Sequence, residues 1–232
     1  MIYVTGDTHG GIDISKLGSK YFTEQAALTK QDYVIIAGDF GFIWESKVQE
    51  YWLKWFEEKN FTTLFVDGNH ENFDLINSYE TELWNGGKIH RISNSIIHLI
   101  RGQVFTIENK KIFSFGGGRS IDKLRRIEGR SWWKEEMPSQ EEYSEAIDSL
   151  NKNNWNVDYI ITHTAPSSII QILKTTHDVY NKENELSDFL EEIVKRAKYE
   201  KWFFGHYHLD KNIDNKYYAL YQNISALNGA MR

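Results

Sequence analysis

Residues 201–208 read KWFFGHYH, an apolar run that ends in a glycine and two histidines. The run predicts a buried β-strand, and we extend that strand through His208. Successive side chains of a strand point to opposite faces, so His206 and His208 are expected to project from the same face. Two imidazoles on one face indicate a shared ligand, although two hydrogen-bonded core histidines would give the same pattern.

Four other segments also place a metal-binding type of side chain directly after an apolar run. They are GDTHG (6–10), AGDFG (37–41), DGNHE (67–71) and THTAP (162–166). Together with GHYH they hold five of the eight histidines in the chain. Because ligands of open α/β sheets collect at the carboxyl ends of the strands, we expect these five segments to converge in space.

Each segment alone has an ordinary structural explanation, such as a glycine turn, a helix start or a buried histidine. Five of them in one chain favour a metal site instead. The available donors are carboxylates, an amide and imidazoles, because the chain has no cysteine. This set suits Mn²⁺ first, with Fe or Zn²⁺ as alternatives. Two such cations about 3.5–4 Å apart, bridged by a carboxylate, would clamp the attacking and leaving oxygens of a displacement.

The spacing of apolar and polar residues predicts an α/β fold in a single domain, residues 1–232. Three early strands are expected at 2–5, 33–39 and 62–70, with a helix starting after Ser46 between the last two. The stretch 95–118 is interpreted as two strands joined around residues 108–110. The later elements are a long surface loop at 119–138, a helix capped by Ser139 and Glu142, a strand at 157–163, a helix at 186–197 and further strands within 213–227.

The composition and charge of the chain limit its expected partners and location. The net charge of −6 argues against long nucleic acid as a partner, since such binders usually carry a basic surplus. No apolar stretch approaches the roughly 20 residues that span a membrane. The amino-terminal segment MIYVTGDTHG resembles a first strand rather than a secretory signal, so a cytoplasmic protein is expected.

In their order, the five segments resemble the motifs of the calcineurin-like metallophosphoesterase superfamily, from the first strand to residue 208. The resemblance implies a four-layer α-β-β-α sandwich of two mixed sheets flanked by helices. It also implies two bound divalent metal ions. The implied ligands are Asp7, His9 and His208 for the first metal, and Asn69, His163 and His206 for the second.

Two further residues take roles from the same resemblance. Asp39 would bridge the two metals, and a hydroxide held between them would attack the phosphorus of a phosphate ester. His70 would be catalytic without binding metal, by stabilising the phosphoryl oxygens or by protonating the leaving group. The substrate would be a phosphorylated small molecule, a nucleotide or a phosphoprotein.

One departure from the resemblance concerns a missing arginine. The related Ser/Thr protein phosphatases extend the second segment to GDxVDRG, whereas this chain reads GDFGFIW and has Ile43 at the arginine position. If phosphate needs an arginine, Arg119 after the glycines of FSFGGGR is the first candidate, with Arg125 and Arg126 as alternatives. Trp132 and Trp133 in the same loop would be either packing residues or a stacking face for a base.

Two rival functions remain open at this point. The same centre could serve a nucleotide or nucleic-acid phosphodiesterase, with the arginine and tryptophan loop contacting the base. Alternatively, the chain could be a catalytically silent scaffold that binds a partner protein. A silent scaffold is expected to lose ligands or the catalytic histidine, whereas this sequence retains all of them.

Overall fold

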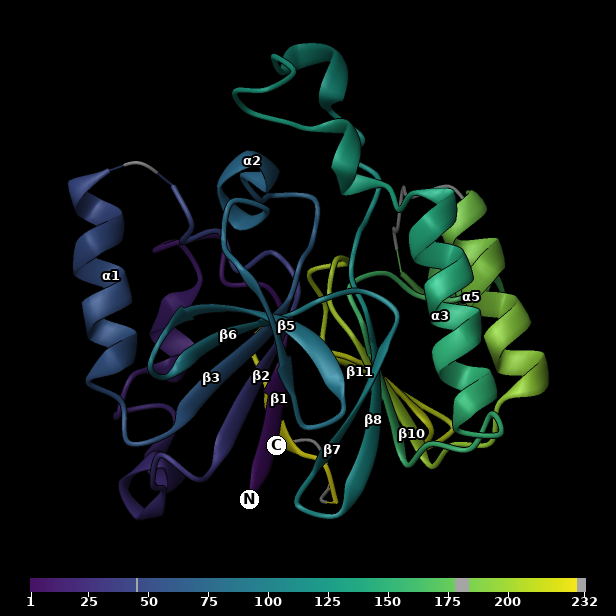
Figure 1. The fold of residues 1–232 in the computed structure, drawn as a ribbon, viewed down its shortest axis with the longest axis horizontal. Helices are drawn as coiled ribbons and strands as arrows, with labels where there is room; N and C mark the ends of the chain where they lie inside the picture. Colours follow the sequence, from purple (N-terminus) through teal and green to yellow (C-terminus); the bar gives the residue numbers. More distant parts are fainter. Residues whose placement is uncertain (45, 178–183, 229–232) are drawn as a thin grey trace.

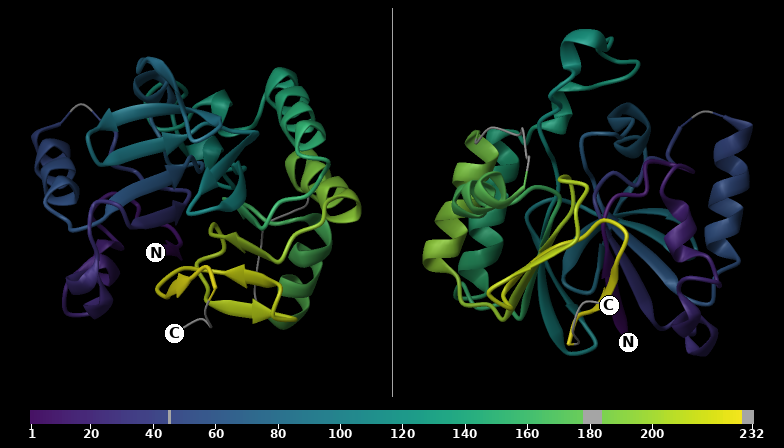
Figure 2. Two further views of the ribbon diagram at one scale, coloured as in Figure 1. Left: turned by 60° about the horizontal axis from the view of Figure 1, so that its bottom comes forward. Right: turned by 180° about the vertical axis from the view of Figure 1, so that it is seen from behind.

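Two β-sheets pack face to face, and helices cover their outer faces (Figures 1 and 2). This computed structural model describes residues 1–44, 46–177 and 184–228. Each sheet combines parallel and antiparallel pairs. The predicted α/β sandwich of two mixed sheets flanked by helices is therefore confirmed.

The first sheet is built mainly from the amino-terminal half of the chain. Its strand order is β13 (Ile224–Ala226), β1 (Ile2–Thr5), β2 (Tyr33–Ala37), β3 (Thr62–Val66), β6 (Ile96–Leu99), β5 (Gly87–Ser93) and β4 (Thr81–Trp84). The four strands from β1 to β6 in this order are parallel, and the outer strands pair antiparallel. The carboxyl ends of the parallel strands therefore share one edge.

The second sheet is built from strands between residues 103 and 219. Its strand order is β11 (Lys211–Ile213), β12 (Tyr217–Ala219), β10 (Lys201–Phe204), β9 (Tyr159–Thr162), β8 (Lys110–Phe115) and β7 (Gln103–Ile107). The four inner strands are parallel, while β11 and β7 pair antiparallel at the two edges.

The helices have the caps that the sequence indicates. Helix α1 (Lys47–Glu57) starts at Ser46, whose side chain accepts a hydrogen bond from the Gln49 backbone, and α3 (Gln140–Lys152) starts with a complete capping box. The other helices are α2 (Phe73–Ile76), α4 (Ser167–Thr176) and α5 (Glu185–Arg196). None of the helices in the described part of the chain combines the length and the apolarity that crossing a membrane requires.

Three apolar layers hold the sandwich together. One lies between the sheets and includes Ile35 and Phe203. A second lies between the first sheet and α1 and includes Phe56 and Phe65, and the third lies under α3, α4 and α5. Alternate residues of a strand fill opposite layers, so a strand buried on both faces reads as a continuous apolar run.

The interpretation of 95–118 as two strands is wrong, because the structure has three strands there. Ile96–Leu99 pairs in the first sheet, and the chain then crosses to β7 in the second. The crossing includes Gly102, whose φ of 75° is in the left-handed region that favours glycine. The hairpin β4–β5 and helix α4 were not predicted.

We expect Phe65→Ala to lower the free energy of unfolding by about 3–5 kcal/mol, the usual cost of removing a buried phenylalanine side chain. Phe65 is fully buried and its ring stacks on that of Phe40 with centroids 4.3 Å apart. The control is Leu83→Ala on β4, because the Leu83 side chain is 84% exposed and its loss should change stability by less than about 0.5 kcal/mol. Urea denaturation measures the free energy of unfolding of both variants. An equal loss in the two would contradict the assignment of Phe65 to the core.

Candidate metal centre

The predicted ligand residues follow five parallel strands whose carboxyl ends meet. Asp7, Asp39 and Asn69 come after β1, β2 and β3 of the first sheet, and His163 and His206 follow β9 and β10 of the second. In Figure 1, β1 runs upward from the amino terminus, so the centre lies above the strands in that view. Residues 199 positions apart in the sequence, Asp7 and His206, are in direct contact there.

One group of donors consists of Asp7, His9 and His208. Their ligand atoms all lie within 4.8 Å of one another. His208 Nε2 is 3.2 Å from Asp7 Oδ2, and the His9 and His208 rings meet edge to face with centroids 4.8 Å apart. Asp7 is fully buried, whereas the His208 side chain is 50% exposed, so this group opens to solvent on one side.

A second group consists of Asn69, His163 and His206. His163 Nε2 is 3.1 Å from Asn69 Oδ1 and also 3.1 Å from His206 Nδ1. His163 is fully buried. Burial lowers the pKa of His206 to about 3, with a further contribution from neighbouring His163, so this imidazole is neutral and keeps a lone pair.

The Asp39 carboxylate lies between the two groups. Its Oδ2 is 3.2 Å from His9 Nε2, and its Oδ1 is 3.4 Å from His163 Nε2. Burial acts to raise the pKa of Asp39, but His163 and His9 outweigh burial and hold it well below the usual range. The carboxylate is therefore ionised, with one oxygen directed to each group.

The hydrogen bonds of His163 and Asn69 explain why the second group can hold a divalent cation. His163 Nδ1 lies 2.9 Å from the Ala37 carbonyl, which can only accept, so Nδ1 carries the hydrogen. The Asn69 amide donates its Nδ2 hydrogen to Ser120 Oγ, which directs Oδ1 toward His163. His163 Nε2 and Asn69 Oδ1, 3.1 Å apart, are therefore the atoms directed toward a common point, where both could bind one cation.

The prediction that β10 extends through His208 is wrong. The strand ends at Phe204, and the His206 and His208 backbones have φ values of 69° and 49° in the left-handed region. The cause is a distant contact, because the His206 backbone N–H donates to both oxygens of the Asp7 carboxylate at 3.0 and 3.1 Å and so leaves the sheet ladder. The two side chains consequently diverge, His206 toward His163 and His208 toward Asp7.

Two glycines leave room for the donors, as expected from their place beside the ligands. A Cβ on Gly205 would lie 2.2 Å from Asp7 Oδ1. A Cβ on Gly38 would lie 2.0 Å from His163 Nδ1, and the φ of 92° at Gly38 already disfavours other residues. Any side chain at either position would displace a donor.

Asp13 and Tyr221 support the first group and were not identified from the sequence. Asp13 Oδ2 lies 2.7 Å from His9 Nδ1, and its Oδ1 accepts a hydrogen bond from the Tyr221 hydroxyl. The Tyr221 ring stacks on His208 with centroids 4.9 Å apart. A carboxylate four residues after His9 was a usable signal for Asp13, whereas Tyr221 reaches the site only through the tertiary fold.

The loop 119–138 approaches the site with a different arginine from the first candidate. Arg119 is exposed, and its substrate role stays a prediction. Arg126 instead places Nη1 and Nη2 each 3.2 Å from a ring nitrogen of His70. Trp133 is a packing residue, because it is buried and donates to Asp74 at 2.8 Å, while the half-buried Trp132 lies under the Lys123 ammonium.

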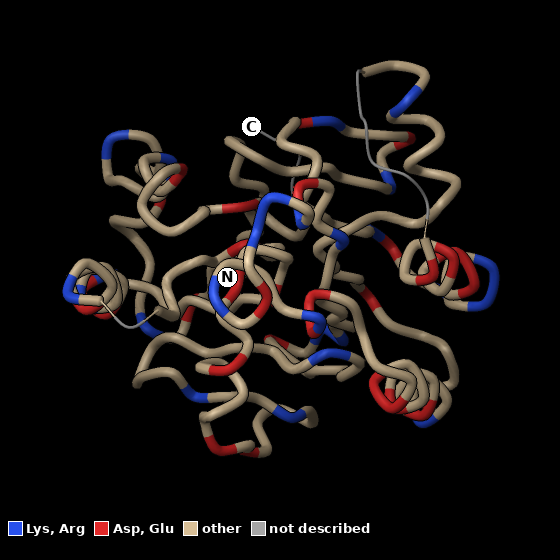
Figure 3. The backbone as a smooth tube through the Cα atoms, turned by 90° about the horizontal axis from the view of Figure 1, so that it is seen from above, with Lys and Arg blue, Asp and Glu red and all other residues tan. Residues whose placement is uncertain are grey.

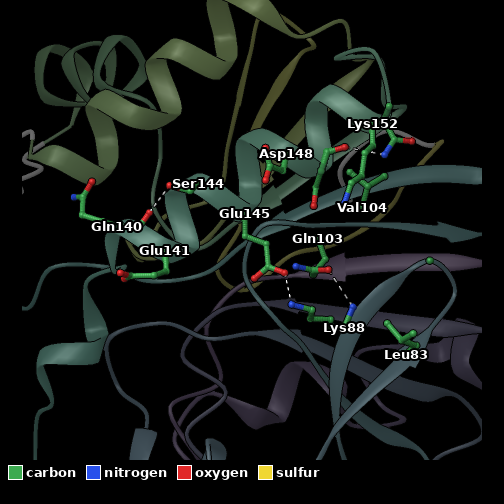
Figure 4. Close-up of a pocket in the computed structure, with 13 residues that line it drawn as sticks. Leu83, Lys88, Gln103, Val104, Gln140, Glu141, Ser144, Glu145, Asp148 and Lys152 are labelled. Carbon is green, nitrogen blue, oxygen red and sulfur yellow. Dashed lines mark hydrogen bonds and ion pairs between the residues drawn. The ribbon is translucent and has the colours of Figure 1, made fainter.

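A pocket of about 630 Å³ lies away from these residues, between α3 and the β4–β5 hairpin (Figure 4). Most of the residues that line it are polar or charged. Lys88 pairs with Glu145 across it, and the Lys88 backbone donates to Gln103. No predicted metal ligand lines this pocket.

A comparison with models of known protein families identifies the family of this chain. The model of the calcineurin-like phosphoesterases matches residues 1–210, a span that includes every predicted ligand. The chain belongs to this family. Calcineurin-like phosphoesterases hydrolyse phosphoesters and typically bind divalent metals, and the Asp and His clusters described above are able to hold such ions. A search of the curated proteins found no match to the chain.

We expect Asp13→Ala to weaken Mn²⁺ binding by about 10–100-fold, the usual effect of removing a carboxylate that orients a ligating histidine. The replacement removes the partner of His9 Nδ1 and frees the ring to rotate. Isothermal titration of the metal-stripped protein with Mn²⁺ measures the affinity. Asp148→Ala on the exposed face of α3 is the matched control, and equal affinities of the two variants would contradict a supporting role for Asp13.

Proposed function

We propose that the chain hydrolyses a phosphate ester with water activated by two divalent metal ions. The single observation that carries this proposal is the position of Asp39, a buried ionised carboxylate with one oxygen toward each donor group. A bridging carboxylate spreads its charge over two cations that would otherwise repel each other. Membership of the calcineurin-like phosphoesterases supports the reaction class.

The donor groups suggest how the metals are divided. In this proposal the ligands are Asp7, His9 and His208 for the first metal and Asn69, His163 and His206 for the second, with Asp39 shared. Carboxylate, amide and imidazole donors suit Mn²⁺, with Fe or Zn²⁺ as alternatives. Each group gathers its three donors from both sheets, so the metals would also join the two halves of the fold.

The chain's own residues have distinct parts in this mechanism. When bound, the metal pair supplies Lewis-acid stabilisation of phosphoryl charge and lowers the pKa of water. Asp39 keeps His70 beside the centre by accepting a hydrogen bond from its backbone N–H at 2.7 Å. The His70 ring meets the His9 ring with centroids 5.2 Å apart, a position from which it can donate a hydrogen bond to a phosphoryl oxygen or a proton to the leaving group.

The substrate in this proposal is a phosphorylated small molecule, a nucleotide or a phosphoprotein. Trp133 does not favour base recognition, since its ring is buried and donates a hydrogen bond to Asp74. A silent scaffold gains no support, because all seven predicted ligands and His70 are present and close together.

Purified protein with Mn²⁺ is expected to hydrolyse a generic aryl phosphate, and chelation should abolish the activity. Asp39→Asn and His70→Ala should each lower kcat/KM at least about 100-fold, because one removes the shared charge and the other a proton donor. Steady-state kinetics at fixed Mn²⁺ measure these rates. Asp148→Asn and His177→Ala, which lie outside the centre, serve as controls. Unchanged rates in both centre variants would refute the mechanism.

Metal analysis tests the division of ligands. We expect about two Mn²⁺ per chain in the unaltered protein and about one in His206→Ala or in His208→Ala, since each removes a ligand of a different ion. Combining His208→Ala with Asp7→Asn should still leave one ion, because both changes affect the same group. Combining His206→Ala with His208→Ala should remove both ions, and retention of one would contradict the assignment.

A further inference from the structure

The loop 119–138 is held at both ends above the metal centre and projects at the top of Figure 1. At its start, Ser120 Oγ accepts a hydrogen bond from the side chain of Asn69. Near its end, Trp133 donates to Asp74, and the Glu136 carbonyl accepts from Gly118. The segment between these anchors is therefore held over the donors, where Arg126 contacts His70.

Arg126 is the loop cation that reaches the centre. Its Nη1 lies 3.2 Å from His70 Nδ1 and its Nη2 lies 3.2 Å from His70 Nε2. Its Nε pairs with Asp122 at 2.9 Å, which orients the guanidinium from behind. The Arg126 side chain is only 15% exposed, although it belongs to a projecting loop.

Arg126 Nη1 also donates to the Ser131 carbonyl at 3.4 Å, but the side of the guanidinium that faces His70 is incompletely paired. A neutral imidazole accepts a hydrogen bond at one nitrogen only, because the other carries a hydrogen. One of the two terminal nitrogens of Arg126 therefore faces a group that cannot accept from it. Two oxygens of a phosphoryl group match this pair of donors far better, since the planar fork of arginine binds oxyanions in a bidentate manner.

Two features of the sequence are consistent with a phosphoryl-binding role for Arg126. Ile43 occupies the position where the related Ser/Thr protein phosphatases have an arginine, and its side chain is buried. Residues 119–133 carry five basic and two acidic side chains, in a chain whose net charge is −6. Figure 3 looks down on this end of the molecule and shows where basic and acidic residues lie. A locally basic loop in an acidic chain favours an anionic ligand.

We propose that Arg126 is the substrate-binding arginine of the metal centre and that its two terminal nitrogens move from His70 to two oxygens of the substrate's phosphoryl group. This inference rests on the proposed function and adds a specificity-determining residue to it. The contact with His70 is then the arrangement without substrate. Arg119 and Arg125 are both exposed, and this proposal gives neither of them a contact with the phosphoryl group.

Binding of inorganic phosphate to the Mn²⁺-loaded protein tests Arg126 independently of catalysis. Isothermal titration should show an affinity at least about tenfold weaker in Arg126→Ala, because a charge-assisted pair of hydrogen bonds is lost. Arg126→Lys should lie between this variant and the unaltered protein, since it keeps the charge without the fork. Arg125→Ala, the adjacent exposed arginine, should stay within about twofold of the unaltered protein. Metal content is measured first for every variant.

The outcomes separate this inference from the proposed function. Unaltered phosphate affinity in Arg126→Ala, or an equal loss in Arg125→Ala, would overturn the role of Arg126 even if the protein hydrolyses aryl phosphates. An inactive unaltered protein would refute the proposed function, and the phosphate titration would still decide on Arg126. If Arg126→Ala fails to retain Mn²⁺, the phosphate affinity of Arg126→Lys is the test instead. An affinity equal to that of the unaltered protein would contradict bidentate binding of phosphate by the guanidinium.

Discussion

The buried charge of Asp39 is the constraint on which the rest of the structure depends. An ionised carboxylate removed from water is stable only when its oxygens are satisfied by hydrogen bonds and opposite charges. Here the Asn69 and His70 backbones donate to one oxygen, and His9 and His163 approach the two oxygens from different sheets. Satisfying this one side chain thus requires the loops after β1, β3 and β9 to meet, which fixes how the two sheets pack at this edge.

Unusual backbone conformations mark the same place. His9, Asp39, His206 and His208 all have positive φ, a region that side-chain-bearing residues seldom adopt. Each such residue costs on the order of 1–3 kcal/mol, which the surrounding packing must offset. Burial also acts to lower the pKa of His9, but the carboxylates of Asp39 and Asp7 outweigh it and raise that pKa to about 9. A metal ion that binds His9 must therefore displace a proton.

Local patterns in the sequence predict the α/β class and the gathering of donors, whereas the sandwich of two mixed sheets was implied by the family resemblance. A buried parallel strand reads as an apolar run, and the glycine and ligand segments mark its carboxyl end. The extent of β10 could not be predicted, because its end is set by the hydrogen bonds of His206 with Asp7 at the far end of the chain. Arg126 could not be distinguished from Arg119 or Arg125 for a similar reason. The loop has no periodicity, and only the tertiary structure shows which arginine contacts His70.

The division of the chain between the sheets has a consequence for how the protein is made. Strands β1 to β6 complete most of the first sheet before residue 100, yet strand β13 at its edge comes from residues 224–226. Neither donor group is complete until the ribosome has passed His206 and His208. A nascent chain therefore presents Asp7 and Asp39 without His163, His206 and His208 for most of synthesis. Such long-range closure slows folding and makes assembly of the donor groups one of its last steps.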